Sequence, residues 1–199
     1  MNALSEIFLE KLAIHDVVQS WALYRDTGDW VGLKSTVHSD ANMTATWFDG
    51  SFNDFIVAVQ DSWRKGSSSQ HFLGGTVSTI QGHKAIAQTR MSIMVRGQIE
   101  GLEVDITCTG RFYDRVEKRD GQWKILKRNV IYEKDRMDLV DPSATLKLDT
   151  LRLNQFPEGY QHLAYLQSLH GANVSTELAT ARGAALEKLT REAQAWLNA

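Results

Sequence analysis

One histidine and one carboxylate in this chain could together form a general base. His71 lies in the stretch SSSQHFLGG, at the expected start of a strand, and Asp26 lies in YRDTGD, at the expected end of a helix. A carboxylate beside an imidazole fixes the ring's tautomer and stabilises the imidazolium that forms when the ring takes a proton. Tyr24 could act as an acid or donate a hydrogen bond to a developing oxyanion. Spacing alone leaves open whether the helix end and the strand start meet.

The other histidines offer no metal site. None is paired with another histidine at i, i+2 or i, i+4, and His162 and His170 are eight positions apart. We expect His15 and His38, in or near surface helices, and His83, in a turn, to be solvated. The chain also has no glycine-rich phosphate loop, G-x-S-x-G motif or CxxC motif. We therefore expect a protein that works without a metal or another cofactor.

Two further polar residues have a structural interpretation. Cys108, the single cysteine, lies in an expected strand, which is typical of a small core side chain rather than a nucleophile. Asp29 directly precedes an expected helix, so we interpret it as an N-cap and not as a second catalytic carboxylate.

The first 65 residues are predicted to form helices around one strand. Residues 5–24 have apolar side chains at helical spacing, and a short second helix is expected from Asp29 through Val37. The stretch ANMTATW predicts a strand, Asp49-Gly50 predicts a turn, and residues 53–65 predict a third helix.

The middle of the chain, from Gln70 to about Arg136, is rich in Val, Ile, Thr and aromatic residues. The short turns QGHK, EG and RDGQ interrupt it, which predicts hairpins and a meander of about four antiparallel strands. One face of such a sheet must be buried, and the preceding helices can cover it. The predicted fold class is therefore α+β, with a curved antiparallel sheet wrapped over N-terminal helices and a hollow for a small molecule between them.

Six side chains are candidates for lining this hollow: Trp21, Trp47, Phe48, Phe55, Asn129 and Tyr132. On the last long strand, side chains alternate between faces, so Arg128 and Asn129 cannot both point inward without a bulge. Trp123 and Ile125 are apolar and lie two positions apart, so they should share the buried face of the strand. Regular alternation from them places Asn129 on the pocket side and Arg128 outside. Tyr113 is a further candidate, and the aromatic residues could equally be ordinary core.

The end of the chain predicts a separate helical extension. After a linker from about 141 to 157, PEGYQHLAYLQSLHG predicts one helix, and residues 175–198 predict another with Ser175 or Thr176 as its cap. We therefore divide the chain into a domain at 1–140 and an extension at 141–199. The apolar residues of the extension must pack on the domain or on a second subunit.

Charge and hydropathy limit the expected partners. The net charge is -2 and no long run of one sign occurs, which gives no support for binding nucleic acid or an anionic membrane. The N-terminus lacks the pattern of a secretory signal, and no segment approaches the ~18 apolar residues of a membrane span. We expect a cytoplasmic protein that acts on a small molecule.

Three motifs resemble the SnoaL-like group of the nuclear transport factor 2-like superfamily. They are IHDVVQSWALYRDTGDWVGLKSTVHSDANMTATW, QHFLGG and GRFYDRVEKRDGQWKILKRNVIYEKD, within residues 5–137. Enzymes of this group include scytalone dehydratase, hexachlorocyclohexane dehydrochlorinase and bile-acid dehydratase. The resemblance implies a cone-shaped α+β barrel in which Asp26 and His71 form a dyad, with Tyr24 beside the aspartate. It also implies a homo-oligomer, either a dimer or a trimer.

The function that the resemblance implies is a cofactor-independent lyase acting on a small aromatic or polycyclic hydroxylated substrate. His71 would be the base for loss of water or for retro-aldol loss of formaldehyde. The arginine that the dehydrochlorinase carries on its last strand would fall at Ile131, and Trp21 replaces a polar residue, so halide binding is not expected. Two alternatives stay open. One is an isomerase of the ketosteroid isomerase type with Asp26 as base, and the other is a non-catalytic ligand-binding module.

Overall fold

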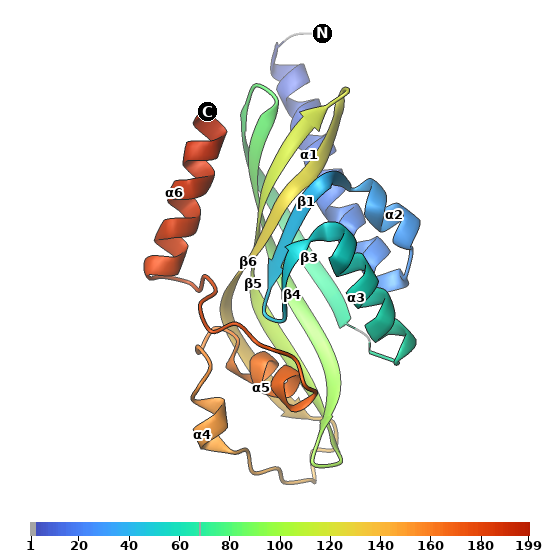
Figure 1. Cartoon of the computed structure of the whole chain (residues 1–199), viewed down its shortest axis with the longest axis vertical. Coiled ribbons are helices and arrows are strands. Elements are labelled where there is room, and N and C mark those ends of the chain that lie inside the picture. The colour runs from blue at the N-terminus through green and yellow to red at the C-terminus, as the bar shows by residue number, and fades with distance from the viewer. Residues whose placement is uncertain (1–2, 68) are drawn as a thin grey trace.

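The computed structural model describes residues 3–67 and 69–199, which form an α+β fold (Figure 1). The helices are α1 (Ala3–Thr27), α2 (Trp30–Ser35), α3 (Phe52–Arg64), α4 (Thr150–Leu153), α5 (Gln161–Leu169) and α6 (Ala184–Asn198). The strands are β1 (Val37–Ala45), β2 (Phe48–Ser51), β3 (Ser69–Gln81), β4 (Lys84–Ile99), β5 (Leu102–Arg119) and β6 (Gln122–Leu139). The predicted fold class is confirmed.

The N-terminal helices form where the sequence predicts them. Gly28, with φ +75°, ends α1 in a conformation that favours glycine. Asp29 then caps α2, because its Oδ1 accepts the Gly32 N–H at 2.8 Å. This cap was predicted, but α2 ends at Ser35, and Val37 already belongs to β1.

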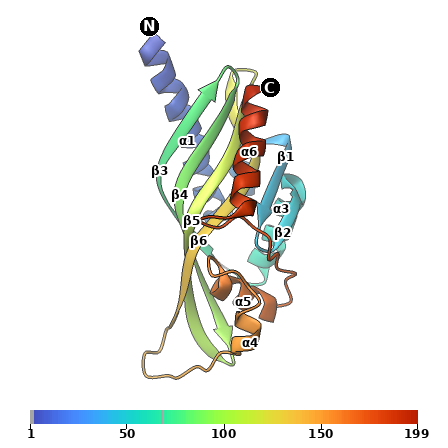
Figure 2. The same ribbon diagram turned by 90° about the vertical axis from the view of Figure 1, so that its left-hand side faces the viewer.

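The six strands form one curved sheet in the order β2-β1-β6-β5-β4-β3. The sheet is open rather than closed into a barrel, with β2 and β3 at its edges (Figure 2). The hairpins that join β3 to β6 are antiparallel, as predicted, but β1 pairs with β6 in parallel. This pairing is possible because α3 connects β1 and β2 to the meander, so no tight hairpin dictates the direction of β1.

The first hairpin turns earlier than predicted. Ala45 pairs with Phe48, so the chain reverses at Thr46 and Trp47. Asp49 and Gly50, predicted to be the turn, lie within β2 instead, opposite β1.

Helices cover both faces of the sheet. The N-terminal helices and α5 share one core cluster with the concave face, while α6 packs on the opposite face, and Figure 1 shows α6 across the sheet from α2 and α3. On the concave face, α5 places Leu163 and Leu166 in the main core. A Cβ on Gly97 of β4 would lie 2.8 Å from Leu166, so a glycine at this position allows α5 to approach the strand.

The C-terminal extension packs on the domain, which was one of the two arrangements expected. Its last helix begins at Ala184, so the prediction of a helix from 175 was wrong. Residues 175–183 bond to the sheet instead: the Ser175 N–H donates to Thr46 O at 2.9 Å, and Ala179 O accepts the Tyr132 N–H at 3.0 Å. These bonds use backbone groups that a helix would need for itself.

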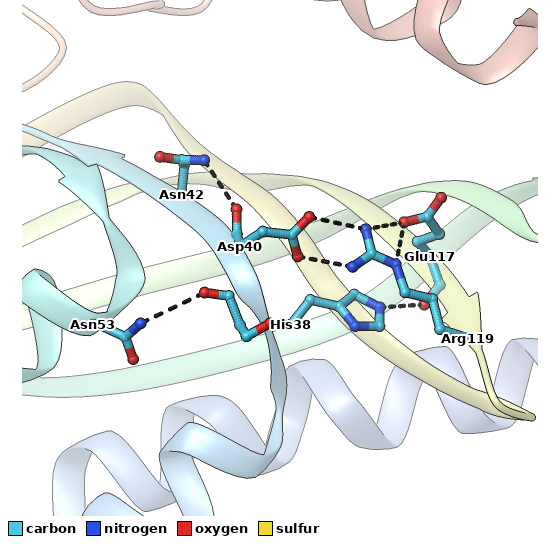
Figure 3. Close-up of polar contacts among 7 residues, drawn as sticks. His38, Asp40, Asn42, Asn53, Glu117 and Arg119 are labelled. Atoms are coloured by element: carbon cyan, nitrogen blue, oxygen red, sulfur yellow. Dashed lines mark hydrogen bonds and ion pairs between the residues drawn. The ribbon is translucent and has the colours of Figure 1, made fainter.

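His38 was predicted to be solvated, and the structure shows that this was wrong. The residue is 8% exposed, and its Nε2 lies 2.9 Å from Glu117 O on β5 (Figure 3). Beside it, Arg119 bonds both carboxylate oxygens of Asp40 at 2.8 and 3.1 Å. This polar cluster covers the histidine and ties β1 to β5. His83 is exposed, as predicted.

Among the described residues, no helix is both long enough and apolar enough to cross a membrane.

Candidate active site

Asp26 and His71 meet, although they are 45 positions apart in sequence. Asp26 lies in the last turn of α1 and His71 near the start of β3. The Oδ1 atom of Asp26 is 2.7 Å from His71 Nδ1, and its Oδ2 accepts the backbone N–H of His71 at 2.5 Å. Both carboxylate oxygens therefore hold the same residue.

The hydrogen bonding of His71 leaves its Nε2 atom available as a base. With Nδ1–H donating to Asp26, the lone pair of the neutral ring is on Nε2. Nε2 makes no hydrogen bond to any described residue. Burial desolvates the imidazolium and lowers the pKa of His71 below its usual 6.5, although Asp26 acts to raise it. At neutral pH the imidazole is therefore uncharged and able to accept a proton.

Aromatic rings enclose the imidazole. The Trp21 ring meets it edge-on at 5.6 Å between centroids, and Phe112 lies at 6.0 Å. Trp21 also stacks on Phe55 at 6.2 Å and meets Phe52 at 6.3 Å. Trp21 and Phe55 were predicted to be here, whereas Phe52 and Phe112 were not.

Arg128 points inward, so the prediction that it lies outside was wrong. The residue is 0% exposed, and its guanidinium carbon lies 4.1 Å from the Trp21 ring centroid and 4.0 Å from that of Phe112. Its Nε and Nη2 bond the buried carboxylate of Asp114 at 2.8 and 2.7 Å. A cation is thus held against the same rings that enclose His71.

A bulge in β6 explains the error. Val116 pairs with Ile125 but Arg115 pairs with Lys127, which leaves Leu126 as an extra residue. The extra residue reverses the alternation beyond it. Arg128 then shares a face with its partner Asp114.

Asn129 consequently does not face the site. It pairs with Tyr113, which packs with Ile131 and the α6 residues Ala193 and Leu197 on the outer face. Tyr113 lies on this outer face too, so it does not line the site as predicted.

Two buried N–H groups near His71 have no hydrogen-bond partner among the described residues. They are Trp21 Nε1 and Arg128 Nη1. A buried donor without an acceptor costs stability, and such donors are retained where they bind a ligand or a developing negative charge.

The remaining predicted residues lie farther from the dyad. Trp47 and Phe48 contact Phe55, at 5.8 and 5.4 Å between ring centroids, and Phe55 in turn stacks on Trp21. The Tyr132 hydroxyl accepts the Thr46 N–H at 3.2 Å, so it links β6 to the first hairpin.

Tyr24 packs against α2 instead of the dyad. A Cβ on Gly32 would lie 2.9 Å from the Tyr24 ring. Within the described structure the Tyr24 hydroxyl makes no hydrogen bond to Asp26 or His71.

Cys108 is fully buried, and burial raises the pKa of its thiol, as suits the core residue predicted.

A second imidazole–carboxylate pair involves Asp135, the β6 residue that pairs with Cys108 of β5. His162 Nδ1 is 2.9 Å from Asp135 Oδ1, while Asp135 Oδ2 accepts the N–H of Leu163. Asp135 thereby anchors the start of α5. No group of three or more residues in the described part of the chain is arranged to bind a metal ion.

Two surface hollows lie away from the dyad. A groove of about 700 Å³ runs between α2 and α3, with Trp30 and Val57 in its walls, and a smaller one of about 210 Å³ lies by Leu102 and Val140. Neither is lined by Asp26 or His71. Neither is therefore the hollow predicted between the sheet and the N-terminal helices, and the candidate site is defined by its hydrogen bonds and ring contacts.

A comparison with protein families matches residues 7–129 to the SnoaL-like domain. The chain belongs to the SnoaL-like family. The pea pathogenicity protein 2 of Fusarium vanettenii is 31% identical over 169 residues, which cover 83% of this chain and 72% of that protein. The family resemblance predicted from the three motifs is confirmed.

Solved structures share the fold of this SnoaL-like protein. A scytalone dehydratase-like protein from Novosphingobium aromaticivorans is similar with a TM-score of 0.57 and 16% identity, over 72% of this chain and 99% of that one. A hexachlorocyclohexane dehydrochlorinase is similar with a TM-score of 0.59 and 14% identity, over 74% and 99%. At these identities the likeness shows the fold.

Proposed function

We propose that this protein is a cofactor-independent lyase, a dehydratase in its simplest form, acting on a small aromatic or polycyclic hydroxylated substrate. His71 is the general base and Asp26 its orienting carboxylate. The observation that carries the proposal is the unbonded Nε2 of an uncharged imidazole whose Nδ1 is fixed by Asp26.

The proposed step is an elimination. Nε2 of His71 takes a proton from a carbon next to an activating carbonyl, the C–H electrons form the double bond, and the neighbouring C–O bond breaks. The departing hydroxide and the proton held by His71 leave together as water. Asp26 stabilises the imidazolium while the proton is on the ring.

Negative charge that develops on the substrate needs donors. We assign this role to Arg128 Nη1 and Trp21 Nε1, which are buried and find no acceptor in the part of the chain that the structure describes. They suit the role better than Tyr24, whose ring packs on α2. Fixed donors in a site shielded from water are worth more than the same donors in solution.

The isomerase alternative has less support. In that mechanism the carboxylate itself shuttles the proton, but both oxygens of Asp26 already accept hydrogen bonds from His71. Both oxygens are thereby directed at His71 rather than at a substrate.

A substrate screen tests the proposal. Purified protein would be incubated with a set of aromatic and polycyclic β-hydroxy ketones, and mass spectrometry would detect loss of water. His71→Asn and Asp26→Asn variants would be run beside it. Dehydration by the wild type that both variants lose supports the proposal, whereas equal activity in all three proteins, or no turnover of any compound, favours a non-catalytic binding module.

A further inference from the structure

Arg25 is a second cation beside the dyad, and among the described residues it has no hydrogen-bond partner. It follows Trp21 by four residues on α1, so the two side chains lie on the same face of the helix, the face that is buried. The Arg25 side chain is only 13% exposed. Its nearest carboxylate oxygen is Asp26 Oδ1, 3.9 Å from Nη1, which is too far for a hydrogen bond.

Two arginines elsewhere in the chain do bond a carboxylate. Arg96 is 55% exposed, and its guanidinium still bonds both oxygens of Asp105, at 2.8 and 2.7 Å. Arg128 is fully buried and bonds Asp114 twice. Arg25 makes no hydrogen bond to any described residue, although it is more buried than Arg96.

Burial without partners destabilises the charged form of Arg25. Desolvation lowers the pKa of its guanidinium, and the opposing effect of Asp26 is smaller. The positive charge of Arg25 also acts to lower the pKa of His71, so it is close enough to influence the base. A partly desolvated guanidinium with free N–H groups is a ready partner for a planar anion.

We infer that the substrate carries a carboxylate and that Arg25 binds it beside the dyad. The inference rests on the proposed function and narrows its substrate class from hydroxylated aromatic compounds in general to those that carry a carboxylate. Arg25 acts here as a specificity-determining residue, while proton transfer stays with His71.

Two ligands of the same shape test the inference. The probes are 2-naphthoate and its neutral isostere 2-naphthamide, with affinities measured by calorimetry at pH 7.5 and low salt. The wild type is expected to prefer the acid by about tenfold or more, the usual advantage of a charge-assisted hydrogen bond. Arg25→Gln is expected to abolish the preference while leaving the affinity for the amide unchanged, and Arg25→Lys to retain part of it.

Arg191→Gln is the matched control, because Arg191 is exposed on α6 on the other face of the sheet. It removes the same charge and should leave the preference intact. An unchanged preference in Arg25→Gln, or an equal loss in Arg191→Gln, would overturn the inference.

The NMR signals of the His71 ring separate this inference from the proposed function. If both probes shift these signals but Arg25→Gln does not alter the preference, only the carboxylate assignment is wrong. If neither probe binds or disturbs His71, the inference fails and the proposed aromatic site fails with it.

Discussion

The guanidinium carbon of Arg128 lies 4.1 Å from the centroid of the Trp21 ring, and each of these two side chains has a buried N–H group that bonds to no described residue. The contact joins β6, in the interior of the sheet, to α1, the helix that carries Asp26. It also places two hydrogen-bond donors beside His71. Substitution of Arg128 should therefore affect both the stability of the protein and its catalytic activity.

Breaking the buried ion pair should be costly. Arg128→Met leaves the Asp114 carboxylate buried and unpaired, so we expect a loss of about 3–5 kcal/mol in the free energy of unfolding. The double variant Arg128→Met/Asp114→Leu removes both charges and should regain most of that stability, measured by urea denaturation. Its activity should stay low because the Nη1 donor is still missing. Full activity in the stable double variant would show that Arg128 has only a structural role.

Two substitutions at His71 should separate the roles of its two ring nitrogens. Asparagine can still donate to Asp26 from the position of Nδ1 but has nothing at Nε2, so His71→Asn should fold normally and lose about 10²- to 10⁴-fold in kcat. Glutamine reaches the Nε2 position and loses the bond to Asp26, so His71→Gln should be the less stable protein. Thermal unfolding and turnover of a substrate from the screen would check both, and near-normal turnover by His71→Asn would rule out Nε2 as the base.

The lowered pKa of His71 should make stability depend on pH. Below pH 6.5 the unfolded chain binds a proton at His71 that the folded protein does not, so the free energy of unfolding should fall as pH decreases from 6.5 to the lowered folded pKa. Above 6.5 this contribution is fully present. Subtracting the denaturation profile of His71→Asn from that of the wild type cancels the other groups, and a flat difference between pH 4 and 7 would contradict the assignment.

Removing the C-terminal extension should expose the core. α5 supplies Leu163 and Leu166 to the main core, so a chain that ends at residue 140 should aggregate or elute as large oligomers in size-exclusion chromatography. A chain that ends at residue 183 keeps α5 and loses only α6, so it should remain folded with a lower Tm. A soluble, monomeric 1–140 fragment with native circular dichroism would show that this domain is independent.

The sequence by itself determined the features that depend on neighbouring residues. The Gly28 helix end, the Asp29 cap and the glycine hairpins follow from local backbone preferences, which short peptide stretches already express. The family resemblance then brought Asp26 and His71 together, which spacing could not do.

Only the tertiary structure decided which residues surround that dyad. The inward position of Arg128 depends on one extra residue, Leu126, in a strand pairing that no local pattern reveals. Nothing in the neighbouring sequence distinguishes Arg25, which the fold leaves largely buried and without a hydrogen bond to any described residue. Residues 175–183 have the composition of a helix, but backbone hydrogen bonds to Thr46 O and from Tyr132 N–H hold them against the sheet. In each case the deciding contact comes from a segment far away in the chain, and its energy outweighs the local preference.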